Sequence, residues 1–286
     1  MPTKIEKDAV TGTMTTGHEW DGIRELNTPL PKWWLWVFYA TIVWSIGYYV
    51  LYPTLPGLNG ILGWSQRAEL ADGMAAERER IRPMLDRIRA TPVTEIRNQP
   101  DLAAFAVAGG RAAFADNCAP CHGAGGAGAK GGFPSLADDE WIWGGDPDAI
   151  QRTVAFGIRS AHPETRQSQM PRFGTDGLLT PAQISDTAEF VLSLSGRAAV
   201  PVAVERGRAI YAEQCAACHG AEGRGMAELG APSLADQIWL YGGDKAAIEH
   251  SIQVARGGVM PAWTDRLDEA TIRMLTLYVH QLGGGR

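Results

Sequence analysis

One stretch of the chain is apolar without interruption. Residues 33–52 read WWLWVFYATIVWSIGYYVLY and contain no charged side chain. Twenty helical residues span about 30 Å, the thickness of the hydrocarbon core of a bilayer. Tryptophans gather at the start and tyrosines at the end, as in the aromatic belts of membrane helices, and Pro31 and Pro53 bracket the run. The pattern predicts one transmembrane helix over residues 33–52.

A buried soluble helix and a cleaved signal peptide are the alternatives to a membrane anchor. A soluble helix rarely has so long an uncharged run, and this run begins after more than thirty mostly polar residues with no small-residue cleavage site behind it. Residues 1–32 are therefore expected to form a separate N-terminal segment before a retained anchor. The flanking charges, Arg24 and Lys32 before the anchor and Arg67 after it, orient it only weakly.

Helical periodicity returns after the anchor. Residues 65–89 carry one apolar stripe on a charged helix, which contains Pro83 and lies within a predicted helical linker over residues 53–107. This helix would rest either on its own protein or on a partner subunit. Two further amphipathic helices are predicted, over residues 181–194 and 269–282.

The second half of the chain is an internal repeat. The strings GRAAFADNC and GRAIYAEQC begin at Gly110 and Gly207, an offset of 97 residues. Two more pairs, PSL with PSL and WIWGGD with WLYGGD, are offset by 98 residues. The repeat predicts two copies of one small helical module, over residues 108–198 and 199–286. Each copy would open with a short helix and close with an amphipathic one, and Phe190 and Tyr278 in the closing helices would cross the opening helices near those glycines, which permit close approach.

Each copy contains the string Cys-x-x-Cys-His, and the two strings use all four cysteines. In this motif the thiols form thioethers with the vinyl groups of a haem and the histidine binds its iron. A four-cysteine zinc site would need pairs roughly 15–20 residues apart, a thioredoxin motif would explain one pair, and a disulfide in so short a loop is strained. The pattern predicts two covalent c-type haems, held by Cys118, Cys121 and His122 in the first copy and by Cys215, Cys218 and His219 in the second.

A methionine precedes a proline late in both copies, Met170 in the first and Met260 in the second. A thioether is a soft, neutral ligand that favours Fe(II) and raises the potential of the iron. A lone methionine is usually core filler, but matching positions in a repeat favour ligation. We expect each methionine to be the sixth iron ligand of its own copy, so that neither iron has an open site for oxygen.

The two methionines lie 90 residues apart and not 98, so the first copy has an insertion, placed around residues 159–168. His162 in this insertion is the rival sixth ligand of the first iron, although a loop histidine is more often solvated. Trp143 and Arg159 carry donors that would compensate haem propionates, and ordinary loop positions are the alternative. Their rough counterparts in the second copy are Tyr241 and Arg256. Three further histidines, His18, His250 and His280, are expected to be solvated or packed.

Acidic residues outnumber basic ones over residues 108–286, by 20 to 15. An acidic surface can steer a basic electron donor such as a soluble cytochrome c, and solubility is an equally simple explanation. Orientation follows from the haems, because bacterial c-type haems are generally attached outside the cytoplasmic membrane. The haem modules are therefore expected in the periplasm, and residues 1–32 in the cytoplasm.

The N-terminal run TGHEWDGIRELNTPLPKWWLW, continuing to Pro53, resembles the start of the two-haem subunit of cbb3-type cytochrome c oxidases. That family also has paired Cys-x-x-Cys-His modules, a Trp-Gly-Gly-Asp element like residues 143–146 and a Ser-Ala-His-Pro-Glu-Thr run like residues 160–165. The resemblance covers essentially the whole chain. The N-terminal run makes it specific, because very many cytochromes share the haem motif.

The resemblance implies a mainly α fold, with one N-terminal transmembrane helix followed by two tandem class I-like cytochrome c domains in the bacterial inner membrane. Electrons from a periplasmic cytochrome c or from quinol:cytochrome c oxidoreductase would enter these haems. They would continue through the one-haem cytochrome subunit to the haem-copper catalytic subunit, with no catalytic residue on this chain. The expected partners are these proteins and membrane lipid, and no nucleic acid. A free membrane-anchored electron carrier and the cytochrome subunit of a periplasmic dehydrogenase remain alternatives.

Overall fold

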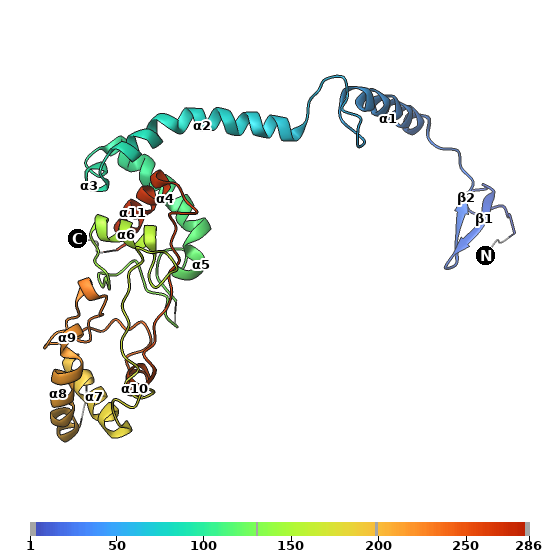
Figure 1. Cartoon of the computed structure of the whole chain (residues 1–286). Coiled ribbons are helices and arrows are strands. Elements are labelled where there is room, and N and C mark those ends of the chain that lie inside the picture. Colours follow the sequence, from blue (N-terminus) through green and yellow to red (C-terminus); the bar gives the residue numbers. More distant parts are fainter. Residues whose placement is uncertain (1–3, 130, 198–199, 284–286) are drawn as a thin grey trace. The chain divides into compact units, whose positions relative to one another are not determined.

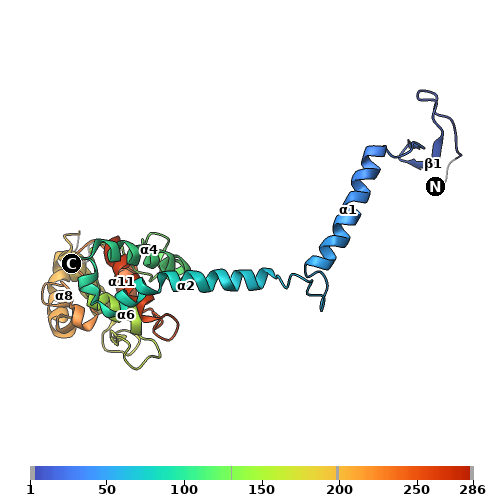
Figure 2. The same ribbon diagram turned by 90° about the horizontal axis from the view of Figure 1, so that it is seen from above.

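The structure, a computed structural model, describes residues 4–129, 131–197 and 200–283. Contacts divide the chain into two units, Met1–Arg80 and Ile81–Arg286. Figure 1 shows the helices and strands coloured along the sequence, and Figure 2 shows the same ribbon from above.

The first unit contains a small hairpin and the apolar helix. Strands β1 (Thr15–Trp20) and β2 (Ile23–Leu26) pair antiparallel. The Asp21-Gly22 turn between them has φ values of 46° and 84°, as a two-residue hairpin turn requires. Helix α1 (Lys32–Leu51) follows Pro31, has no buried residue, and is long and apolar enough to cross a membrane. The predicted helix is therefore present, one residue earlier than expected, and its length and composition fit a membrane anchor.

The linker helix extends from the first unit into the second. Helix α2 (Gln66–Ala90) continues through Pro83, and the short helix α3 (Val93–Ile96) follows it. Ile88 and both ends of α3 are buried in one apolar cluster, which Met84 and Leu85 join from the side. The C-terminal end of the linker helix thus rests on the chain's own haem-motif half, which was one of the two expectations for it.

The two repeat copies contain equivalent helices. The first copy has α4 (Pro100–Asn117), α5 (Ala119–His122), α6 (Pro147–Phe156) and α7 (Pro181–Leu194). The second has α8 (Pro201–Gln214), α9 (Ala216–His219), the 3-10 turn η1 (Ala227–Leu229), α10 (Lys245–Val254) and α11 (Glu269–Leu282). The closing helices α7 and α11 have the predicted bounds, and the described residues are mainly helical, as expected.

The closing helices are exchanged between the copies. Helix α7 packs against α8 and α10 of the second copy, whereas α11 packs against α4 and α6 of the first (Figures 1 and 2). Phe190 therefore crosses at Gly207 and Tyr278 at Gly110, so the expectation that each helix closes its own copy is wrong. Only six residues lie between the end of α7 and the start of α8, and so short a separation favours packing of the two as a helical hairpin, which explains half of this arrangement.

Two loop segments cross where the copies exchange their ends. Ile158 and Met260 form reciprocal backbone hydrogen bonds of 3.0 Å in an antiparallel bridge. The backbone N–H of Trp263 donates to the Ala155 carbonyl at 3.0 Å. The segment after α6 and the segment after α10 thus pass each other, each leading to the other copy.

Substitution of either crossing glycine should be costly. A Cβ at Gly207 would overlap the carbonyl oxygen of Asp186, and both groups belong to rigid helical backbone. We expect Gly207→Ala to lower the free energy of unfolding by about 1–3 kcal/mol, the usual cost of overpacking, in denaturant titrations of the haem-loaded protein. Gly73→Ala in α2 is the control, because a Cβ there meets nothing within 4 Å. Equal effects of the two substitutions would contradict the close crossing.

Candidate functional site

Both Cys-x-x-Cys-His strings form a single helical turn directly after an opening helix. Helix α4 ends as the Cys118 N–H donates to the Phe114 carbonyl at 2.8 Å, and the His122 N–H donates to the Cys118 carbonyl at 2.9 Å. The second copy repeats this turn, with an N–H to carbonyl distance of 3.0 Å from His219 to Cys215. Two thiols and an imidazole therefore lie on one short turn in each copy, as covalent haem attachment needs.

A proline carbonyl fixes the tautomer of each motif histidine. The Nδ1 atom of His122 lies 3.0 Å from the Pro134 carbonyl oxygen, and that of His219 lies 3.0 Å from the Pro232 oxygen. A carbonyl oxygen only accepts hydrogen bonds, so Nδ1 carries the proton and Nε2 keeps its lone pair. Neutral imidazole oriented in this way is the form that binds a metal ion.

The chemistry of the thiols argues against a thioredoxin-like role. Burial raises the pKa of Cys118 and of Cys215 to about 11, and the neighbouring thiol of each pair adds to the shift. Catalytic thiols of redox enzymes have lowered pKa values instead. All four cysteines are free, with Cys121 and Cys218 exposed. Burial also lowers the pKa of His219, which favours its neutral form.

The first haem motif borders an apolar cluster, here called the first pocket. Its buried members are Phe114, Ile150, Val154, Ile272, Leu275 and Val279. Cys118 and Leu136 of the first copy pack against this cluster, and so does Met260 of the second copy.

The second haem motif borders the equivalent cluster, here called the second pocket. Its buried members are Phe173, Leu179, Ile184, Ala188, Phe190, Val191, Leu192, Tyr211, Ile248 and Ile252. Cys215 and Leu234 of the second copy pack against it together with Met170 of the first copy. Met260 therefore packs on the same cluster as Cys118 and Met170 on the same cluster as Cys215, although each methionine was expected beside the cysteines of its own copy; which iron each would bind stays a prediction. The physical cause of this packing is the exchange of the segments after α6 and α10.

His162 in the inserted loop contacts residues of its own copy through its ring face and its Nδ1 atom, and its role as a ligand stays untested. The His162 ring stacks on Phe156 with centroids 4.9 Å apart, and its Nδ1 accepts a hydrogen bond from the Glu164 N–H at 3.0 Å. A neutral histidine that accepts at Nδ1 carries its proton at Nε2, so neither nitrogen has a free lone pair.

Arg159 joins this loop to the second copy. Its Nε donates to the Gly258 carbonyl at 2.7 Å and its Nη1 to the Ser168 carbonyl at 3.0 Å. Near the same crossing, Trp143 lies against Gly230. Propionate binding by Trp143 and Arg159 stays a prediction.

The counterpart of Arg256 is Arg166 and not Arg159. Arg256 lies over the Tyr241 ring at 4.8 Å and donates to the Ala247 carbonyl at 2.7 Å. Arg166 lies over the Trp143 ring at 5.2 Å and donates to the equivalent carbonyl of Ala149 at 3.1 Å. This correspondence could have been recognised from the sequence, because Arg166 and Arg256 lie 90 residues apart, as the two methionines do. The insertion therefore precedes Arg166.

Two buried donors near the pockets were missed by the sequence analysis. Among the described residues, Trp141 Nε1 at the edge of the first pocket and Arg197 Nη2 have no hydrogen-bond partner. Arg197 lies over the ring of Trp239, which packs against the second pocket. Buried donors of this kind need an acceptor, and haem propionates would supply it. Together with the thiols, the oriented imidazoles and the apolar side chains of the two clusters, these donors are of the kinds that would hold a haem in each copy.

Comparisons with known proteins match three successive parts of the chain. The family model described as the N-terminal domain of cytochrome oxidase-cbb3, FixP, matches residues 12–59. A cytochrome c model matches residues 107–195, and a model for cytochrome C oxidase, cbb3-type, subunit III matches residues 202–279.

Similar proteins extend over the whole chain. The cbb3-type cytochrome c oxidase subunit CcoP of Azospirillum brasilense is 52% identical over 98% of this chain and 99% of its own length. Subunit FixP of Bradyrhizobium sp. (strain ORS 278) is 50% identical over 98% of both chains. Subunit CcoP of Cereibacter sphaeroides is 48% identical over 95% of both chains. With these identities over its full length, the chain belongs to the CcoP/FixP family of cbb3-type cytochrome c oxidase subunits.

Proposed function

We propose that this chain carries two covalent haem c groups and relays electrons from a periplasmic donor toward the oxygen-reducing subunit of a cbb3-type oxidase. The observation that carries the proposal is the pair of equivalent sites, each with an oriented imidazole and a methionine at one apolar pocket. Haem c bound there would supply one-electron redox chemistry, with its potential set by the axial ligands.

The side chains have distinct roles in this proposal. The cysteines would hold each haem covalently, and the Nε2 atoms of His122 and His219 would bind the two irons. Met260 would complete the site of the first copy and Met170 that of the second, because each packs with the cysteines of that site. A histidine and a methionine on each iron would leave no position for oxygen, so no catalytic residue is assigned to this chain.

The anchor sets where this relay would act. Helix α1 has the length and composition of a membrane span, with exposed tryptophans at its start. We place residues 1–32 in the cytoplasm and the haem half of the chain in the periplasm, because bacterial c-type haems are generally attached outside the cytoplasmic membrane. The proposed partners are the haem-copper subunit and the one-haem subunit. The proposed donor is cytochrome c or quinol:cytochrome c oxidoreductase.

Purification of the tagged full-length chain in a mild detergent tests this function. We expect b-type haem and copper to co-purify, and oxygen consumption with a basic reduced cytochrome c to fall as ionic strength rises, since an acidic surface would steer the donor. A preparation without b-type haem and copper would contradict the oxidase assignment. A flavin or quinone in their place would support a dehydrogenase subunit.

A further inference from the structure

The two closing helices pack at equivalent places in the two copies, but the side chains that they bury there differ in polarity. The crossing glycines define the equivalence, because Asp186 and Phe190 of α7 lie at Gly207 as Met274 and Tyr278 of α11 lie at Gly110. Asp186 and Met274 lie 88 residues apart in the sequence, and so do Phe190 and Tyr278. By the same offset, Glu189 of α7 corresponds to Leu277 of α11. Two positions that face the neighbouring helices are therefore acidic in α7 and apolar in α11.

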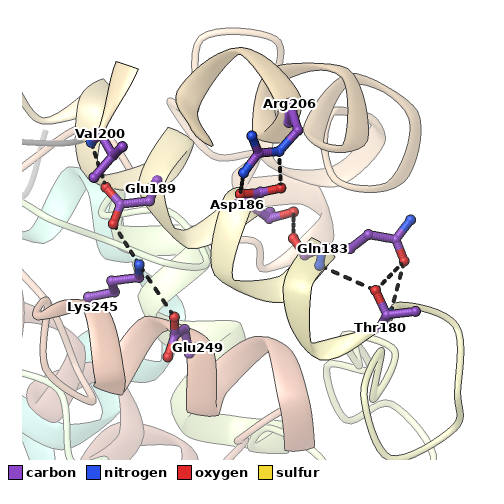
Figure 3. Close-up of polar contacts among 9 residues, drawn as sticks. Thr180, Gln183, Asp186, Glu189, Val200, Arg206, Lys245 and Glu249 are labelled. Carbon is purple, nitrogen blue, oxygen red and sulfur yellow. Dashed lines mark hydrogen bonds and ion pairs between the residues drawn. The ribbon is translucent and has the colours of Figure 1, made fainter. Parts of the chain in front are cut away.

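In the second copy, two cationic side chains, Arg206 and Lys245, contact α7 (Figure 3). Asp186 accepts two hydrogen bonds from Arg206, each 2.6 Å long. Glu189 is only 6% exposed, and it accepts from the Lys245 ammonium at 2.6 Å and from the Val200 N–H at 3.0 Å. The hydrogen bond from Lys245 lowers the pKa of Glu189, so this buried carboxyl is held charged.

In the first copy, the surface on which the corresponding positions of α11 pack is apolar. Leu277 is 6% exposed and belongs to the cluster that contains Ile88 and Ile96 of the linker. Met274 lies against Gly109, which occupies the position that Arg206 has in the second copy.

The linker also binds α11 through polar contacts. Arg273 donates to the carbonyls of Ile88 and Thr91 at the end of α2. Arg89 pairs with Asp268, the N-cap of α11, at 3.3 Å. The aligned residues are Ser185 in α7 and its N-cap Thr180, which are uncharged, and Ser185 is much shorter than arginine.

If each closing helix packed on its own copy, the side chains at these positions would not match the surfaces that they face. Glu189 would replace Leu277 in the apolar cluster, and the position of Lys245 is taken there by Pro147. A buried carboxylate without a partner is strongly unfavourable, whereas a buried pair that keeps its partner is tolerated. In the second copy, Leu277 would face Lys245, whose ammonium would lose its 2.6 Å hydrogen bond to Glu189 and keep only Glu249, at 3.8 Å. Mismatches of this kind are how proteins specify one arrangement over another.

We infer that Glu189 of α7, paired with Lys245, and Leu277 of α11 select the exchanged packing of the closing helices. They are positioning residues, because this packing brings Met170 and Met260 to the cysteines of the opposite copy. Asp186 with Arg206 adds to the same selection. The inference rests on the proposed function for the ligand role of the methionines, and its cross-linking test rests on the covalent attachment of both haems.

Cross-linking of engineered cysteines tests the packing directly. In the haem-loaded chain the native thiols would be thioethers, so introduced cysteines are the only free thiols. A cysteine at position 186 can be paired with either of two others to detect the two arrangements. In Asp186→Cys with Arg206→Cys, the two cysteines can be cross-linked in the exchanged packing. In Asp186→Cys with Gly109→Cys, they can be cross-linked only if α7 lies on α4. A short thiol-reactive linker such as dibromobimane and peptide mapping would score each pair.

With Glu189 present, we expect the 186/206 pair to cross-link and the 186/109 pair to stay at background. Glu189→Leu should raise the 186/109 product several-fold, and Glu189→Leu with Leu277→Glu should make it the major product. Glu189→Gln, which keeps the side-chain volume and the acceptor for Val200, should shift the products in the same direction by less. It also provides the test if the leucine variant does not load haem.

Glu249→Leu is the matched control. Glu249 also pairs with Lys245, at 3.8 Å, but it lies on α10 and not on α7. It should therefore leave both products unchanged. The inference is overturned if Glu189→Leu and Glu189→Gln leave the 186/109 product at background, or if Glu249→Leu raises it equally. The cross-links report helix packing whether or not methionine binds iron, so a failed ligand assignment would show separately, as a missing methionine-to-iron charge-transfer band.

Discussion

Replacement of Cys118 and Cys121 by alanine is expected to halve the covalent haem of the chain, from two groups to one. The two thiols lie on one helical turn with His122, and Cys215 of the other pair packs on a separate apolar cluster. The pyridine haemochrome spectrum, divided by the protein concentration, measures this ratio. In the purified oxidase, oxygen consumption with reduced cytochrome c should fall to the level without donor if the two sites act in series.

Pro120→Ala is the control for this experiment. It keeps both thiols and the histidine, and the second copy already has Ala217 at the aligned position. We expect two haems per chain in this variant. A cysteine variant that retained two covalent haems would contradict the attachment sites.

Met170→His is expected to lower the potential of one haem only, that of the second copy. Met170 packs with Cys215 at the second pocket, and histidine is a stronger donor to Fe(III) than a thioether. Axial ligands set haem potentials over roughly 0.8 V, so the shift should be a large part of the difference between His/Met and bis-His sites. Spectroelectrochemical titration would resolve it as one displaced component beside one unchanged component.

Met226→His is the matched control for Met170→His. Met226 lies in the second copy, 36% exposed, and is not part of the second pocket. Both potentials should stay in place in this variant. Two unchanged potentials in Met170→His would exclude Met170 as a ligand.

Local patterns along the chain predicted its local structure well. The uncharged run became α1, and the amphipathic periodicity of residues 181–194 and 269–282 gave the bounds of α7 and α11. Helices of this kind are set by burial of one face, which is visible in sequence. The β1–β2 hairpin was missed because its strands lack alternation, although the Asp21-Gly22 turn was an available signal.

The exchange of the closing helices was not visible in these patterns. Both helices have an apolar face, and periodicity does not say which opening helix that face meets. The difference lies in pairs far apart in sequence, such as Glu189 with Lys245 and Arg273 with the Ile88 carbonyl. These pairs are known only once the fold brings them together. The haem motifs were predictable because covalent attachment requires a fixed local spacing.

The most direct test of the account asks which methionine serves which haem. In the Cys118→Ala/Cys121→Ala background only the haem of the second copy remains, so its spectrum is unambiguous. We predict that Met170→Leu abolishes the near-infrared methionine-to-iron charge-transfer band of this haem and that Met260→Leu leaves it unchanged. Loss of the band in Met260→Leu, with the band intact in Met170→Leu, would contradict the exchanged arrangement.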